Sequence, residues 1–142
     1  MARRENDHIG NFNFKVEIEG VTQGAFMEVN GLESATEVFE GNDGNNLLLR
    51  KLPGRTSYSN IVLRRGFTNS DELFNWRKTV TDGNTERKAG SIILCDEKGD
   101  EIMRYNFFEA WPCRWKLSPL SAQDRRNLVE EIEIAVEKIE RG

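Results

Sequence analysis

Histidine is almost absent from this sequence: among its 142 residues there is a single one, His8. A Ser-His-Asp or Cys-His catalytic device needs a histidine as its base, and His8 lies in a polar N-terminal segment. The commonest zinc ligand sets also depend on histidine. We therefore expect no histidine-based catalysis and no metal site, and the sequence predicts no cofactor.

Cysteine is also rare, and the two that occur, Cys95 and Cys113, have a spacing that matches no zinc or redox motif. We expect both to be small residues in or near the core, in a reducing compartment. A phosphate-binding loop is missing too, because the glycines of 41–44 are not followed by the lysine and hydroxyl residue that a P-loop requires.

No charge of one sign dominates, since 20 basic and 24 acidic residues give a net charge of −4. A nucleic-acid-binding surface needs clustered excess Lys and Arg, which is not found here. No apolar run approaches the roughly 20 residues of a membrane span. Residues 1–10 lack the apolar middle of a signal peptide and predict a flexible N-terminal tail. The chain is thus expected in the cytoplasm unless another machine exports it.

Carboxylate pairs are the remaining candidates for catalysis, for example Asp96 with Asp100 or Glu131 with Glu133. With 24 acidic residues such pairs arise by chance, and we interpret them as solvated turn and strand residues. A small hydrolase or ligand-binding barrel, the most distant alternative, would need convergent polar groups in a pocket. The sequence offers no such cluster, so it predicts a protein that is not an enzyme.

Alternation of apolar and polar residues is the main structural signal. Phe12, Phe14, Val16 and Ile18 alternate with polar residues, which is typical of a strand with one buried face. Further strands are predicted near 26–29, 36–40 and 58–64, and as a hairpin over 91–95 and 101–108. The segments at 110–112 and 118–120 predict a bend and an irregular stretch.

One helix is predicted over 69–81. Asn69 is a plausible N-cap with Glu72 at capping-box spacing, Leu73 and Trp76 share a face with Val80, and 82–84 forms the stop. The last segment, 128–139, fits strand and helix periodicity about equally. The chain as a whole predicts a single domain, 1–142, that is mainly β: a two-sheet antiparallel barrel or sandwich with one flanking helix.

Residues 40–58 predict an extended loop. Residues 41–46 are all turn formers, and the apolar triplet Leu47, Leu48 and Leu49 follows them abruptly. Two interpretations stay open for the triplet. It is either the buried start of a strand or an interface that becomes ordered only on assembly.

Five marks in register, over about residues 11–140, resemble a known family. The strongest is 51–66, with a Pro-Gly turn, Ser-Asn, and an apolar strand that ends in Arg-Gly. The others are 26–33, 72–76, 106–112 and 132–139. Together they resemble the tail tube proteins of contractile phages and of related extracellular contractile injection systems. The segment 122–128 departs from the family pattern because it is more highly charged.

This resemblance implies a fold, an assembly and a set of partners. It implies a two-sheet β-barrel with one external helix, and a strand for the ambiguous segment 128–139. Six copies would form a ring, and rings would stack into a hollow tube that carries DNA or protein cargo. The implied partners are a sheath protein, baseplate or hub proteins and a tail terminator. The tube would assemble in the bacterial cytoplasm and become part of a virion tail or of a released injection particle. A secreted type VI-like hexameric ring protein is the nearer alternative.

Two sets of residues are candidates for the work of such a tube. The inter-ring contact is expected at Gly41, Asn42, Asp43, Gly44, Asn45, Asn46, Leu47, Leu48, Leu49, Pro53, Gly54, Arg55 and Tyr58. The face toward the lumen is expected to carry either Lys15, Glu17 and Glu19, or Glu131, Glu133 and Glu137. An acidic lining would repel DNA weakly and let it slide.

Overall fold

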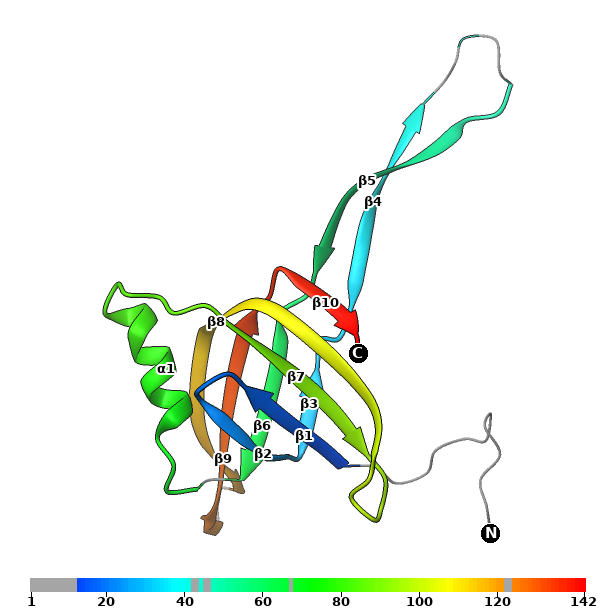
Figure 1. Ribbon diagram of the computed structural model, residues 1–142. Coiled ribbons are helices and arrows are strands. Elements are labelled where there is room, and N and C mark those ends of the chain that lie inside the picture. Colours follow the sequence, from blue (N-terminus) through cyan, green and yellow to red (C-terminus); the bar gives the residue numbers. More distant parts are fainter. Residues whose placement is uncertain (1–12, 42–43, 45–46, 67, 122–123) are drawn as a thin grey trace.

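The computed structural model describes residues 13–41, 44, 47–66, 68–121 and 124–142 (Figure 1). The predicted tail over 1–10 lies outside these residues. The elements, in chain order, are β1 (Asn13–Ile18), β2 (Thr22–Phe26), β3 (Glu28–Asn30), β4 (Ser34–Gly41), β5 (Arg50–Tyr58), β6 (Ile61–Gly66), α1 (Glu72–Thr81), β7 (Lys88–Cys95), β8 (Glu101–Ser121), β9 (Asp124–Ala135) and β10 (Lys138–Arg141).

The strands form two antiparallel layers joined by β8. The order of the main sheet is β2-β1-β7-β8-β9-β6-β3, and β10 also pairs with β8. The first half of β8 pairs with β7 and β10, and its second half pairs with β9. We call β2-β1-β7-β8-β10 the first layer and β8-β9-β6-β3 the second layer. The predicted two-sheet antiparallel architecture with one helix is confirmed.

β8 changes layer where the sequence predicts a bend. Glu109 has a positive φ of 54°, and register shifts flank Ala110 on the β7 side and Pro112 on the β9 side. Proline has no backbone N–H to donate to a regular ladder, so within a sheet it is found at irregular positions such as this bulge. The chain bends there but remains one strand through Ser121. The irregular stretch predicted at 118–120 lies within this strand, where the register with β9 shifts between Pro119 and Ser121.

The core lies between the two layers. Val16 and Ile92 come from the first layer, and Leu63 and Ile132 from the second; all four are fully buried. The alternation that predicted β1 holds, because Val16 and Ile18 are buried while Lys15 is exposed. The ambiguous segment resolves into β9 and β10, with a break after Ala135.

Helix α1 covers one side of the two layers, next to β8 (Figure 1). Leu73 and Trp76 are buried in the core, as the helical spacing predicts. The capping box at Asn69 is wrong: the N-cap is Asp71, without a side-chain hydrogen bond. The predicted stop is confirmed, because the helix ends at Thr81 and Gly83 adopts a φ of 85°, which glycine tolerates best.

Candidate functional site

A two-stranded arm projects from the body of the protein. β4 and β5 pair with each other in a sheet of their own, and Figure 1 shows them extending away from both layers. The prediction of an extended loop over 40–58 is therefore wrong for residues 50–58, which form strand β5. The ladder between β4 and β5 has one register shift, between Thr36 and Val38 of β4. The Pro-Gly pair at 53–54 lies within β5, at this irregularity, instead of forming a turn.

The predicted inter-ring residues are distributed along this arm. Gly41 ends β4, and Pro53, Gly54, Arg55 and Tyr58 belong to β5. Gly44 and Leu47–Leu49 lie between the two strands, at the far end of the arm. The candidates Asn42, Asp43, Asn45 and Asn46 lie outside the described residues.

The arm exposes an unusual amount of apolar surface. Leu47 is fully exposed, and Leu48 is 79% exposed. Further large apolar side chains that are at least half exposed are Val38, Phe39, Leu49 and Leu52. The interpretation of Leu47–Leu49 as the buried start of a strand is wrong, because the triplet precedes β5 and stays exposed.

The two alternative lumen sets lie on different layers. Lys15 and Glu17 belong to β1, and Glu19 directly follows it, on the first layer. Glu131 and Glu133 belong to β9 on the second layer, and alternate with the buried Ile132 and Ile134. Because the layers share one core, their outer faces point in different directions. The two sets are therefore separate faces of the protein.

A row of alternating charges crosses the outer face of the second layer. Glu28 of β3 and Glu131 of β9 both pair with Arg64 of β6, each with an N···O distance of 3.1 Å. Lys116 of β8 lies opposite Glu131 in the ladder. Hydrogen bonds from Asn30 and Arg64 lower the pKa of the Glu28 carboxyl. This face is thus mixed in charge where the sequence predicts an acidic one.

Next to this row, Asn60 and Cys113 contact Glu133. The Asn60 amide donates a hydrogen bond of 2.9 Å to the Glu133 carboxylate, and the Cys113 sulfur lies 3.6 Å from the same oxygen. Burial, together with the nearby Glu133 charge, raises the pKa of the Cys113 thiol. Cys113 is half-buried and Cys95 is buried, so the prediction that both are core or near-core residues is confirmed. Glu137, the third member of this set, pairs instead with Arg87 at 2.8 Å.

A buried ion pair was missed by the sequence reasoning. Arg65 and Glu130 are 6% and 4% exposed, and Arg65 Nε donates to Glu130 Oε1 at 2.8 Å. The indole N–H of Trp115 donates to the other oxygen of Glu130 at 2.9 Å. Strand parity gives the signal that could have found them. Arg65 follows Ile61 and Leu63 at steps of two, and Glu130 precedes Ile132 and Ile134 in the same way.

The carboxylate pairs considered for catalysis are accounted for by local structure. Asp96 accepts hydrogen bonds from the backbone N–H groups of Lys98 and Asp100, which closes the β7–β8 turn. In the described part of the chain, no His, Cys, Asp and Glu side chains cluster as metal ligands would. Over the same residues, no helix is long and apolar enough to cross a membrane.

Comparison with solved structures identifies close relatives of this fold. A chain of the sheath–tube complex of PVC, an extracellular contractile injection system, matches with a TM-score of 0.83 and 26% identity, over 97% of this chain and 93% of that one. The tube-terminating cap of the anti-feeding prophage matches with a TM-score of 0.81 and 22% identity, over 100% and 95%. Hcp1 from Flavobacterium johnsoniae matches with a TM-score of 0.57 and 21% identity, over 92% and 94%, and shares the fold alone.

A search of curated proteins found no match. A family model, described as T4-like virus tail tube protein gp19, matches residues 10–140, which is nearly the whole chain. This match favours the tail tube over the type VI-like alternative, which rests on weaker likeness of fold. The chain therefore belongs to the T4-like tail tube protein family, and it is a structural tail tube protein of a contractile phage tail or injection particle, not an enzyme.

Proposed function

We propose that six copies of this chain form a ring and that rings stack into a hollow tube, a conduit for DNA or protein cargo. The observation that carries this proposal is the arm β4–β5. Large apolar side chains of the arm are exposed to solvent. Over its described length, the arm contacts the body of the protein chiefly at its base. Contiguous exposed apolar surface marks a contact with another chain. Stacking supplies that contact.

The ring contact uses strand edges. In the described residues, β2 forms a ladder only with β1, and β3 only with β6. Such edges are liable to pair with other chains unless they are covered. Pairing from copy to copy around a ring closes the sheet and leaves no edge. The single domain over 1–142 is then one segment of a larger barrel.

The inter-ring contact belongs to the arm, including the candidate residues in β5. For the lumen we choose the face with Glu131 and Glu133. Its support is the charge row from Glu28 to Arg64 and Glu131, in which opposite charges bind each other and leave less net field to hold a polyanion. Glu137, the third candidate of this set, follows β9 and pairs with Arg87.

The partners follow from where similar chains are found. Chains of similar fold occur in a PVC sheath–tube complex, a PVC sheath/tube terminator and an anti-feeding prophage baseplate. By this likeness, our chain binds a sheath around its outer surface and meets baseplate or hub proteins at one end and a terminator at the other. Assembly takes place in the bacterial cytoplasm, before the tube leaves as part of a tail or a released particle.

Negative-stain electron microscopy of the purified chain, with its mass in solution, tests the proposal. We expect rings or stacked tubes with an open centre and a mass of six chains or a multiple. Tube growth can require a baseplate to start, so the same measurement is repeated after co-expression with the neighbouring tail genes. A chain that stays monomeric in both preparations would overturn the proposal.

A further inference from the structure

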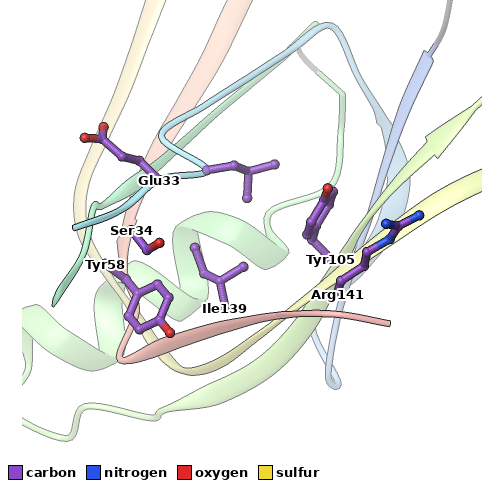
Figure 2. A pocket seen from close by; sticks show the side chains of 7 residues that line it. Glu33, Ser34, Tyr58, Tyr105, Ile139 and Arg141 are labelled. Atoms are coloured by element: carbon purple, nitrogen blue, oxygen red, sulfur yellow. The ribbon is translucent and has the colours of Figure 1, made fainter. Parts of the chain in front are cut away.

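A pocket lies at the base of the arm. Its volume is about 320 Å³. The pocket is lined by residues at the base of the arm, where β4 begins and β5 ends, and by residues of the first layer. These residues are Leu32, Glu33, Ser34, Tyr58, Tyr105, Ile139 and Arg141. Figure 2 shows Ile139 between Tyr58 on one side and Tyr105 with Arg141 on the other. The floor is thus apolar and aromatic, and the charged groups Glu33 and Arg141 lie at the margin.

The opposite end of the arm presents side chains that suit such a floor. Leu47 and Leu48 are the most exposed large apolar residues of the described chain. They lie on a two-stranded arm, which has no interior in which to bury them. An aliphatic side chain set among tyrosine rings loses its contact with water and leaves the hydroxyl groups free to stay hydrated.

We propose that Leu47 and Leu48 of one copy insert into the Tyr58–Tyr105–Ile139 pocket of a copy in the next ring. This inference rests on the proposed tube, and it names the surface that receives the arm. The occupant is a second copy of this chain, because the same sequence carries both the exposed leucines and the pocket.

The geometry makes this contact run head to tail. β4 has eight residues, so it spans about 26 Å at roughly 3.3 Å per residue. A rigid arm of that length keeps its own leucines away from its own pocket. A contact between unlike surfaces that does not close generates an open-ended assembly, which is what stacked rings require. The arm then sets the axial step between rings.

The charges around the two surfaces are compatible with this contact. Glu40 lies opposite Lys51 on the arm, just behind the leucines, and the pocket margin carries Glu33 and Arg141. Each surface therefore carries one acidic and one basic side chain. When the leucines are inserted, each of these charged groups can pair with a group of opposite charge on the other surface.

Cysteine cross-linking tests the contact. The double variant Leu48→Cys/Leu32→Cys places one thiol at the tip of the arm and one in the pocket, and the protein is oxidised after tubes have formed. A disulfide needs Cα atoms within roughly 7 Å, which one arm cannot provide between its own tip and base. The single variants control for Cys95 and Cys113, and Leu48→Cys/Thr81→Cys, with its second thiol on the exposed end of α1, is the matched control.

We expect a ladder of linked chains that runs well past six in the double variant and is absent from every control. A ladder that stops at six would place the contact within one ring and overturn the proposal. No ladder in tubes that electron microscopy shows to be intact would also overturn it, while the tube function would stand. Failure of the unaltered chain to form tubes would instead count against the proposed function itself.

Discussion

The aromatic ring of Phe39 in β4 lies over Gly54 in β5, where a β-carbon on residue 54 would collide with the ring. The two residues occupy one face of the arm, beside the register shift between β4 and β5. Glycine is thus needed at residue 54 because a neighbouring side chain occupies the space, and Phe39 in turn covers the irregular part of β5.

The first prediction concerns this contact. Gly54→Ala should displace the Phe39 ring from its rotamer, at a cost of about 1 kcal/mol, and weaken the arm. Because the arm lies outside the core, the melting temperature of the body should stay unchanged while tubes become fewer and shorter in electron micrographs. Gly66→Ala is the control, since open space surrounds a β-carbon there. Normal tube growth in Gly54→Ala would show that the stacking of rings does not depend on the conformation of the arm around Gly54.

The second prediction concerns the buried ion pair. Glu130→Ala leaves Arg65 buried without its carboxylate, and we expect a loss of about 3–5 kcal/mol in the free energy of unfolding. The double variant Arg65→Met/Glu130→Leu removes both charges and should recover most of that loss. Urea denaturation measures both values. Glu137→Ala, which breaks an exposed pair with Arg87, should cost less than about 1 kcal/mol.

If the double variant were no more stable than Glu130→Ala, the two charged groups would be required for a reason other than their mutual pairing. The hydrogen bond from Trp115 to Glu130 is the first contact to examine in that case.

The third prediction concerns acid. Hydrogen bonds from Asn30 and Arg64 lower the folded-state pKa of Glu28 from its ordinary value. Its ion pair with Arg64 therefore contributes stability when the pH is above the ordinary pKa of the carboxyl, and this contribution is lost as the pH falls through the folded-state pKa. The difference in melting temperature between the native protein and Glu28→Gln should be present at neutral pH and vanish in acid. A difference that is constant with pH would show that the amide acts by another route.

The fourth prediction concerns the lumen. If the outer face of β9 lines the channel, Glu133→Lys should leave tubes intact and increase the retention of a short DNA oligonucleotide inside them. Glu133→Gln separates loss of the Asn60 hydrogen bond from reversal of charge. Glu17→Lys on the first layer should not change retention. Loss of assembly in Glu133→Lys would place the residue in an interface, and retention by Glu17→Lys would select the other face.

Local alternation was sufficient to predict much of this fold. β1 and the helix each have one buried face. The spacing of their apolar residues therefore predicts which face is buried, even when the element that packs against it is not known. The arm was harder to predict. Pro53-Gly54 is typical of a turn, but the pair lies within β5. There Gly54 packs against the ring of Phe39, a contact between residues 15 positions apart that the local sequence does not reveal.

Charged residues were the second source of error. The burial of Arg65 and Glu130 was not predicted, because a charged side chain is rarely buried without a partner. The partner lies 65 residues away and becomes adjacent only when β6 pairs with β9. The two lumen sets failed to separate for the same reason. Parity assigns each residue a side of its own strand, but the stacking of the two layers decides which sides share a surface.

Strand β8 has a mechanical consequence. Its 21 residues belong to both layers, so one covalent backbone joins the two sheets across the bend at Glu109. A push on one layer reaches the other through peptide bonds and two hydrogen-bonded ladders, and does not depend on side chains sliding past one another. A tube wall built from such subunits resists shear between its inner and outer layers. The tube would therefore transmit an axial force along its length with little deformation.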